Sequence, residues 1–482
     1  MRTKVFKLIC FLLFAANVNA QSALQNYVDE WVQHPFFKNS EISFAVHGIE
    51  SQKLLAGHRM SKSAIPASSL KVLTTFIIYE ELGYDFTYKT QLAHDGTIDS
   101  DGTLQGNLYF IGSGDPSLGS GRFDSFPNFD QLMDTIVSKV IRHGITCIDG
   151  DIIVDNSIFD AFPIGSTWQC NDLGNYYAGG TWGFNINENE YSIFYNTKKK
   201  IGQRASYTYQ NPVIPGLELE HEVVVDSANT GDNSYIFGGP LVYQKRVMGK
   251  LPYDEKPFKI KGSIPDPPKF AAYSIYNYLQ KKDIASAGFE VINKPSPIVL
   301  QYFDTLVSPK LGLLCEQTNH RSINQYCDAF LKTLGLRMRG KGSSEDGIAY
   351  VEEYLLAMDI DINGLNMKDG SGLSARSYVP AELLSSFVAK YAAKHSIETI
   401  QHLLPEAGKE GSVKGVLLGA KIAPNFWMKS GSMDRVLSYT GICKTKSGKW
   451  VSFSIIVNNY NVKFRDVKYR VERLFDAIYT YG

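Results

Sequence analysis

Strand-like segments lie at both ends of this 482-residue chain, and their separation constrains the fold more than any other feature. The runs 41–49 and 53–60, near the N-terminus, and 437–444 and 450–458, near the C-terminus, have the composition of strands. Helical periodicity is found between the two ends and after them, at residues 270–281, 310–316, 325–334, 381–393 and 467–479. We therefore predict an α/β (α+β) fold in which one sheet is built from distant segments and covered by helices on its faces.

The composition changes at about residue 86. Residues 86–265 are rich in Gly, Asn, Asp and Tyr with alternating apolar residues, and they contain one clear helical pattern, at 129–141. A chain of this length also accommodates more than one domain. We predict a β-rich insertion, residues 86–265, in a domain made of residues 21–85 and 266–482.

The first twenty residues have the pattern of a secretory signal peptide. Arg2, Lys4 and Lys7 precede a short apolar stretch, residues 8–16, and small residues end the segment at Ala20. The apolar stretch is too short to serve well as a transmembrane anchor. We therefore expect cleavage after Ala20 and secretion, with no transmembrane anchor in the mature protein.

Charge and cysteine content exclude several classes of function. The chain carries 49 basic and 49 acidic residues, so nothing favours a polyanionic partner such as nucleic acid. The short run Lys198–Lys200 is typical of a solvated loop. Five scattered cysteines remain after cleavage and form no CxxC pair, and the histidines show no metal spacing. We expect no metal and no cofactor. The sequence does not decide whether Cys315 and Cys327 form a disulfide.

Ser68 and Lys71 form the first candidate catalytic pair. Their spacing on a helix that begins near Pro66 brings both side chains to one face, within hydrogen-bonding reach. A serine hydroxyl needs a neighbouring base to become a good nucleophile, and a lysine with a lowered pKa can supply one. The Ser-x-x-Lys pattern occurs once in the chain.

Two shorter motifs add polar groups. Ser322-Ile323-Asn324 precedes a helical pattern, where it is either an ordinary N-cap or a proton relay beside a substrate-binding amide. Lys429-Ser430-Gly431 opens a strand, so that Lys429 can bind a carboxylate while Gly431 lets a substrate lie against the strand edge. Second copies, at 227–229 and 446–448, show how common both motifs are, and the latter is predicted to be a hairpin turn.

These three motifs, in this order, are the signature of penicillin-binding proteins and class A β-lactamases. The chain resembles the D-Ala-D-Ala carboxypeptidase/endopeptidase branch of the low-molecular-mass (class C) penicillin-binding proteins. Further segments that are similar to this family cover most of the mature chain, at residues 112–116, 150–159, 174–189, 369–374, 403–417 and 430–441. The resemblance implies a transpeptidase/β-lactamase-like domain, with an antiparallel sheet flanked by helices, that is split by the insertion.

The resemblance also implies roles for the motif residues. Ser68 becomes the acylated nucleophile and Lys71 its base, Ser322 shuttles a proton and Asn324 orients substrate and lysine. Lys429, with Ser430 and Gly431, binds the terminal carboxylate of a D-Ala-D-Ala stem peptide. The backbone N–H groups of Ser68 and Ser432 form the oxyanion hole. Asp155, in the insertion, is a weaker candidate for binding a substrate amino group, and a solvated turn is the alternative for it.

The resemblance implies a periplasmic hydrolase that acts on peptidoglycan stem peptides and is acylated covalently by β-lactam antibiotics. Two alternatives stay open. A β-lactamase shares the motifs, although class A enzymes lack an insertion of this size. A catalytically inactive cell-wall-binding module is the other, although all five motif side chains are intact.

Overall fold

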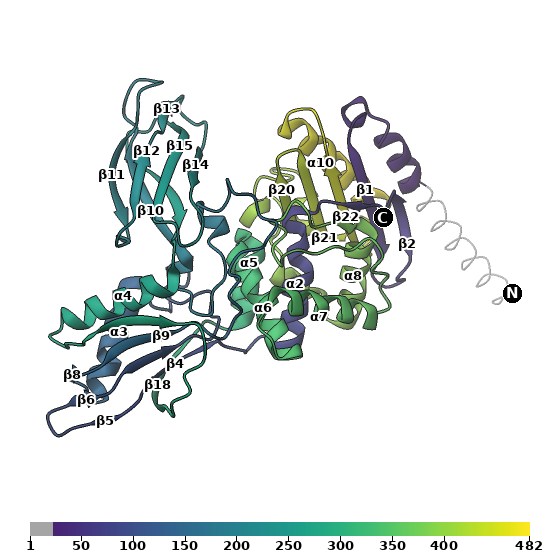
Figure 1. Cartoon of the computed structure of the whole chain (residues 1–482). Helices are drawn as coiled ribbons and strands as arrows, with labels where there is room; N and C mark the ends of the chain where they lie inside the picture. The colour runs from purple at the N-terminus through teal and green to yellow at the C-terminus, as the bar shows by residue number, and fades with distance from the viewer. Residues whose placement is uncertain (1–22) are drawn as a thin grey trace. The chain divides into compact units, whose positions relative to one another are not determined.

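A computed structural model of the chain describes residues 23–482, and the predicted signal peptide, residues 1–20, lies outside this range. The chain forms two compact units (Figure 1). Among the described residues, the first unit combines 23–81 with Cys315–Ile323 and Ile348–Gly482, and the second combines Leu82–Leu314 with Asn324–Gly347. No helix between residues 23 and 482 is long and apolar enough to cross a membrane.

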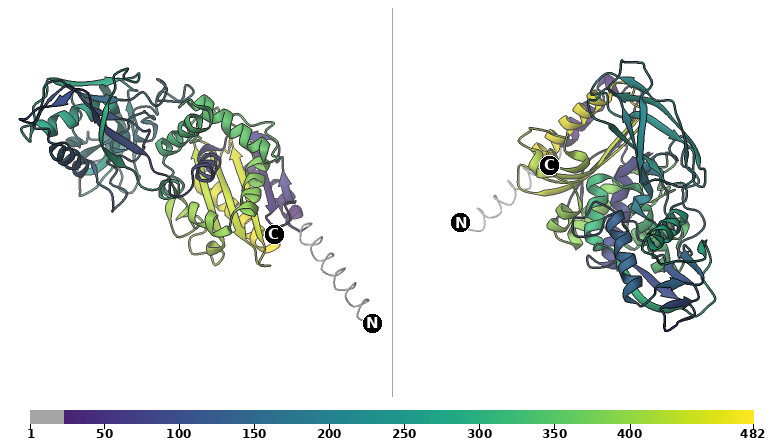
Figure 2. Two further views of the ribbon diagram at one scale, coloured as in Figure 1. Left: turned by 90° about the horizontal axis from the view of Figure 1, so that it is seen from below. Right: turned by 90° about the vertical axis from the view of Figure 1, so that its left-hand side faces the viewer.

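The first unit contains the sheet that is predicted from the two ends of the chain. Its strand order is β2-β1-β22-β21-β20, and all neighbours are antiparallel. The strands are β1 (Glu41–Gly48), β2 (Leu54–His58), β20 (Phe426–Met433), β21 (Val436–Lys444) and β22 (Trp450–Asn458). In Figure 2 the purple N-terminal strands lie beside the yellow C-terminal ones. The prediction of one sheet from distant segments is therefore confirmed.

Helices cover both faces of this sheet. Alternate residues of β1 point to opposite sides, so Phe44 packs in the same core as Phe475 of α10 (Phe464–Tyr481). On the other face, Ser43 Oγ accepts a hydrogen bond from the N–H of Ala381, the first residue of α8 (Ala381–Lys394). The helices of this unit also include residues 23–31, α2 (Lys71–Leu82), α9 (Ile397–Leu403) and parts of α5 (Leu311–Arg321) and α7 (Ser344–Ala357).

The second unit contains a five-stranded mixed sheet in the order β17-β9-β7-β4-β18. Its strands are β4 (Lys89–His94), β7 (Leu108–Ile111), β9 (Asp151–Asp155), β17 (Gly288–Ile292) and β18 (Gln301–Val307), with the small strands β5 (Thr97–Ile98), β6 (Thr103–Gln105) and β8 (Cys147–Ile148) nearby in the chain. The helices of the unit include α3 (Phe129–Arg142), α4 (Pro267–Gln280) and α6 (Asn324–Arg339).

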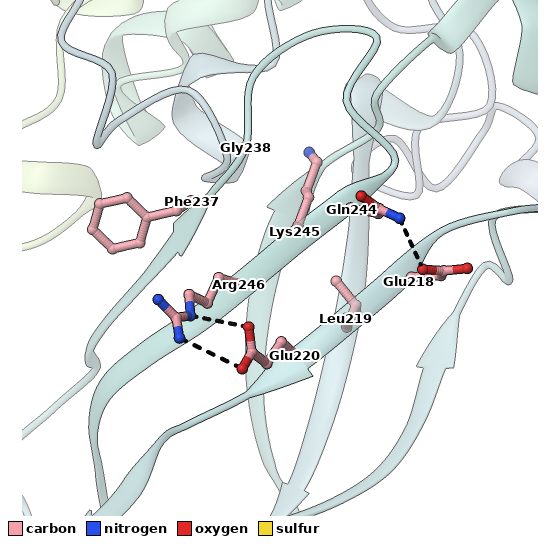
Figure 3. A pocket seen from close by; sticks show the side chains of 8 residues that line it. All are labelled: Glu218, Leu219, Glu220, Phe237, Gly238, Gln244, Lys245 and Arg246. Carbon is pink, nitrogen blue, oxygen red and sulfur yellow. Dashed lines mark hydrogen bonds and ion pairs between the residues drawn. The ribbon is translucent and has the colours of Figure 1, made fainter.

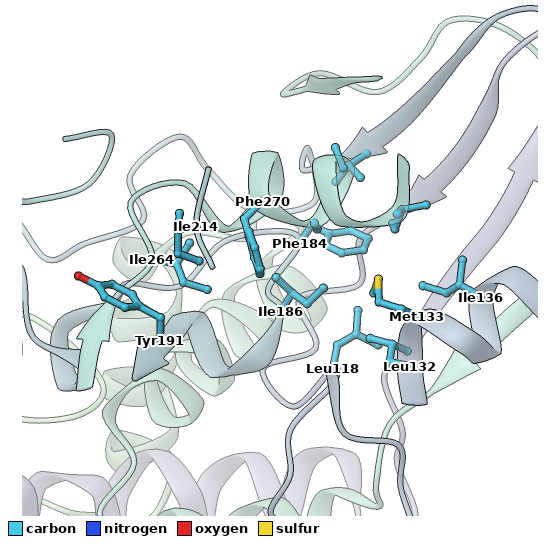
Figure 4. Close-up of a cluster of buried hydrophobic side chains, with 14 of the residues drawn as sticks. Leu118, Leu132, Met133, Ile136, Phe184, Ile186, Tyr191, Ile214, Ile264 and Phe270 are labelled. Carbon is cyan, nitrogen blue, oxygen red and sulfur yellow. The ribbon is translucent and has the colours of Figure 1, made fainter. Parts of the chain in front are cut away.

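Besides the small sheet β5-β6-β8, two larger sheets belong to the second unit. The first has the order β11-β10-β16, and in the second β15 pairs with β12, β13 and β14. Their strands are β10 (Glu190–Asn196), β11 (Ser206–Asn211), β12 (Glu218–His221), β13 (Val224–Asp226), β14 (Asn233–Phe237), β15 (Gln244–Pro252) and β16 (Phe258–Ser263). One hydrophobic core joins the unit, and Figure 4 shows Met133 of α3, Tyr191 of β10 and Phe270 of α4 within it.

The second unit is larger than the predicted insertion, residues 86–265. Strand β17 pairs in parallel with β9, and β18 pairs with β4, so residues 266–314 complete a sheet of this unit. Helix α6, residues 324–339, also belongs to it. The boundary predicted at residue 265 therefore differs from the structural one, because Pro267 and Pro268 begin helix α4, which continues the second unit.

Candidate active site

Ser68 and Lys71 lie where a 3-10 turn passes into a helix. The turn η2 (Ala67–Leu70) follows Pro66, and α2 begins at Lys71. Lys71 Nζ donates a hydrogen bond to Ser68 Oγ over 2.9 Å, and the Lys71 side chain is fully buried. The contact that the i, i+3 spacing predicts is therefore present.

The loop 369–374 supplies a further acceptor for this lysine. Lys71 Nζ donates to the Ser371 carbonyl oxygen over 2.6 Å. The buried Asp369 carboxylate shapes the loop, because its two oxygens accept the N–H groups of Gly372 (2.8 Å) and Ser374 (2.7 Å). Asp369 therefore fixes the loop that presents the Ser371 carbonyl to Lys71.

Strand β20 approaches the serine turn closely. A Cβ added to Gly431 would lie 2.8 Å from Ser68 N and 2.5 Å from the Pro66 carbonyl oxygen, which is shorter than real contacts allow. Beside it, Ser69 Oγ and Ser438 Oγ of β21 are 2.8 Å apart. Only glycine at position 431 lets the strand lie this close to the Ser68 N–H.

Lys429 and Ser322 meet in the same unit. Lys429 Nζ donates to Ser322 Oγ over 3.0 Å and to the Ser430 carbonyl oxygen over 2.6 Å, and Lys429 is fully buried. Ser322 follows the end of α5 with φ 59°, a left-handed conformation that is unusual for a residue with a side chain. Ser430 lies half-buried, and its hydroxyl contacts Ser412 Oγ.

Asn324 and Asp155 belong to the second unit. Asn324 starts α6, and its side-chain amide donates to the Tyr177 carbonyl oxygen over 2.9 Å. Asp155 ends β9, is buried, and accepts the N–H of Ser157 over 2.8 Å. It lines a cavity of about 880 Å³ in that unit. The structure thus brings Ser68, Lys71, Ser322 and Lys429 into the first unit, with Ser432 exposed at the end of β20.

The second copies of the short motifs lie in turns. Residues 446–448 connect β21 to β22, where Gly448 has φ 87°, so the predicted hairpin turn is confirmed. Residues 227–229 follow β13. The Ser371 carbonyl, by contrast, was not among the predicted site groups, because a backbone acceptor has no side-chain signature. The Asp-Gly-Ser-Gly turn at 369–372 is the one sequence signal that could have located it.

Other sites could be formed by metal ligands, by the cysteines or by the pockets of the second unit. In the part of the chain from residue 23 onward, no cluster of three or more His, Cys, Asp or Glu side chains could hold a metal ion, and no disulfide joins Cys315 to Cys327. A pocket of about 620 Å³ lies between β12, β14 and β15 of the second unit (Figure 3). Burial lowers the pKa of Lys245, beside this pocket, to about 7, and its ammonium donates to the Ser263 carbonyl oxygen over 2.6 Å.

Comparison with known proteins identifies the family. The model of the D-Ala-D-Ala carboxypeptidase 3 (S13) family matches residues 24–476. The D-alanyl-D-alanine carboxypeptidase DacB of Haemophilus influenzae is 25% identical over 92% of this chain and 89% of its own length. The crystal structure of penicillin-binding protein 4 from H. influenzae covers 94% of this chain and 99% of that one, with a TM-score of 0.81 and 24% identity, which shows the fold. A second structure of that protein, in complex with a β-lactam, has a TM-score of 0.76 at 23% identity. The chain therefore belongs to the D-Ala-D-Ala carboxypeptidase 3 (S13) family.

Proposed function

We propose that this chain is a secreted, periplasmic serine D-Ala-D-Ala carboxypeptidase that cleaves peptidoglycan stem peptides through an acyl-enzyme on Ser68. The observation that carries the proposal is the 2.9 Å hydrogen bond between Lys71 Nζ and Ser68 Oγ, made by a fully buried lysine that also donates to the Ser371 carbonyl oxygen. Family membership supports the reaction, and the β-lactam complex of the H. influenzae relative supports acylation by β-lactams.

The first step is the attack of Ser68 on the peptide carbonyl. In its neutral form Lys71 would have two N–H groups and one lone pair. It would still donate to the Ser371 carbonyl oxygen, while the hydrogen bond to Ser68 reverses and the lone pair accepts the Ser68 proton. The Ser68 Oγ then forms a bond to the carbonyl carbon of the penultimate D-Ala. The N–H groups of Ser68 and Ser432 would stabilise the resulting oxyanion, each worth about 3 kcal/mol in the transition state.

The second step releases D-Ala and leaves the acyl-enzyme. Lys429 would bind the terminal carboxylate of the substrate, with Ser430 and Gly431 lining the same strand. Ser322, in contact with Lys429 Nζ, would relay the proton that Lys71 took from Ser68 to the leaving amine as the C–N bond breaks, so that both Lys71 and Ser322 return to their starting states. Water then hydrolyses the ester and regenerates Ser68. Asn324 would orient the substrate.

We extend the proposal to Asp155 as a contact for an amino group on the substrate side chain. Its carboxylate lies at the wall of a cavity of about 880 Å³ that Phe159 and Lys341 also line. The Ser157 N–H donates a hydrogen bond to one carboxylate oxygen over 2.8 Å, which fixes the orientation of the group.

Carboxypeptidase and endopeptidase activity are tested by comparing D-Ala release from pentapeptides with cleavage of cross-linked dimers.

The decisive experiment is fluorescent-penicillin labelling of the mature protein. We expect a stable covalent band in wild type, its loss in Ser68→Ala, and an undiminished band in the control Ser447→Ala, which alters an exposed serine of the hairpin turn 446–448. D-Ala release from a soluble D-Ala-D-Ala peptide should follow the same order, and Lys71→Ala should lose both. Rapid turnover of nitrocefin would instead indicate a β-lactamase, and peptide binding without label or D-Ala release would indicate an inactive binding module.

A further inference from the structure

The first turn of helix α6 is held by one loop of the second unit, residue by residue. Asn324 Nδ2 donates to the Tyr177 carbonyl oxygen over 2.9 Å. The Gln325 carbonyl oxygen accepts from Thr181 Oγ1 over 3.2 Å. Tyr326 OH donates to the Glu188 carboxylate over 2.8 Å. Three consecutive residues of the helix thus contact the loop 177–188.

The last of these contacts is part of a buried ionic cluster. Glu188 Oε1 accepts hydrogen bonds from Ser120 Oγ and Arg122 Nε, both over 2.6 Å, as well as from Tyr326 OH. Tyr326 is fully buried, and Glu188 and Ser120 are nearly so. Burial raises the pKa of Glu188, but the hydrogen bond and charge of Arg122 outweigh burial and keep the pKa below its usual value. The carboxylate therefore stays ionised and accepts a strong, charge-assisted hydrogen bond from the Tyr326 hydroxyl.

The backbone of the loop is strained where it carries this carboxylate. Asn187, Glu188 and Asn189 have φ values of 50°, 54° and 54°, a left-handed conformation that is costly for residues with a Cβ. Three such residues in a row persist only when their surroundings hold them. Asn189 contributes, because its amide donates to Asn185 Oδ1 over 2.8 Å and to the Gly180 carbonyl oxygen over 3.1 Å.

We infer that the loop 177–188 positions Asn324 for catalysis, with the Glu188–Tyr326 hydrogen bond as the main anchor. Tyr326 lies two residues after Asn324 in the same helical turn, so a shift of its ring shifts the turn and the Asn324 side chain with it. Glu188 and Tyr326 are positioning residues and need not contact the substrate. The inference rests on the role proposed above for Asn324.

Two tyrosine variants, each of which removes one buried hydroxyl contact of α6, provide the test. Tyr326→Phe removes the hydroxyl that contacts Glu188 and keeps the ring. Tyr88→Phe is the matched control, because Tyr88 OH is 3.0 Å from Thr333 Oγ1, further along α6, and is also buried. We expect Tyr326→Phe to slow penicillin acylation about tenfold, below the roughly hundredfold that a 1 Å misplacement can cost. Tyr88→Phe should acylate at the wild-type rate, with both melting temperatures measured alongside.

The double variant with Asn324→Ala tests the route of the effect. If Tyr326 acts through Asn324, Tyr326→Phe should cause no additional loss in the Asn324→Ala background. Equal acylation rates in Tyr326→Phe and Tyr88→Phe, or additive losses in the double variant, would overturn the inference alone. A wild-type rate in Asn324→Ala would overturn the role of Asn324 and the inference together, while Ser68→Ala still reports on the nucleophile.

Discussion

Replacing Gly431 by alanine tests how closely strand β20 must approach the nucleophile. The new Cβ would lie 2.4 Å from Ser438 Oγ, 2.5 Å from the Pro66 carbonyl oxygen and 2.8 Å from Ser68 N. Ordinary contacts begin at 3.4 Å, so the strand or the serine turn must move by roughly 0.5–1 Å. A displacement of that size at reacting groups costs up to about 100-fold in rate, and overpacking costs about 1–3 kcal/mol of stability.

The assay for Gly431→Ala is the second-order rate of acylation by fluorescent penicillin, with thermal unfolding of the same samples. Gly415→Ala is the matched control, because the nearest atom to its added Cβ is Lys468 Nζ, at 3.7 Å. We expect the control to acylate normally. A folded Gly431→Ala protein that acylates at the wild-type rate would refute the idea that this glycine sets the distance between the strand and Ser68.

Three further variants probe other parts of the first unit. Lys429→Ala should lower kcat/KM about 10- to 100-fold for a peptide with a free terminal carboxylate but much less for its amide, and equal losses would refute carboxylate binding. Asp369→Asn should leave the N–H of Gly372 or Ser374 without an acceptor, cost about 1–3 kcal/mol in urea unfolding and slow acylation; unchanged acylation would show that the loop does not matter for Lys71. Burial lowers the pKa of His47 from 6.5 to about 4, so protonation opposes folding and stability should fall between pH 6.5 and pH 4, by at most about 3 kcal/mol. His47→Asn should flatten that pH dependence of urea unfolding, and a slope equal to wild type would contradict the assignment.

The sequence predicted the first unit well because its periodicity is strong. The runs 437–444 and 450–458 became β21 and β22 almost unchanged, and the helix predicted at 381–393 is α8, Ala381–Lys394. The second unit was harder to delimit. Strand β17 hydrogen-bonds to β9, more than a hundred residues earlier, and alternation within a strand does not reveal which partner it takes.

In the candidate site, too, contacts set by local spacing could be predicted, and contacts between distant segments could not. Side-chain motifs with a fixed spacing, such as Ser68 and Lys71, could be predicted because a helix turn dictates their contact. The contact between Lys429 and Ser322 was not predicted, because 107 residues separate them and no local geometry links the two. The Ser371 carbonyl could not be predicted from its residue type, because any amino acid offers the same acceptor.

The pairing of β1 with β22 also affects how the protein is made. Strand β1 ends at Gly48 and β22 begins at Trp450, so the ribosome adds about 400 residues between the two. At typical elongation rates, the first strand waits about 20–80 s for its partner. The N-terminal strands therefore stay unpaired on that side while the chain emerges, and a product truncated before residue 450 cannot close the sheet. The first unit can therefore complete its sheet only after the whole of β22 has been synthesised.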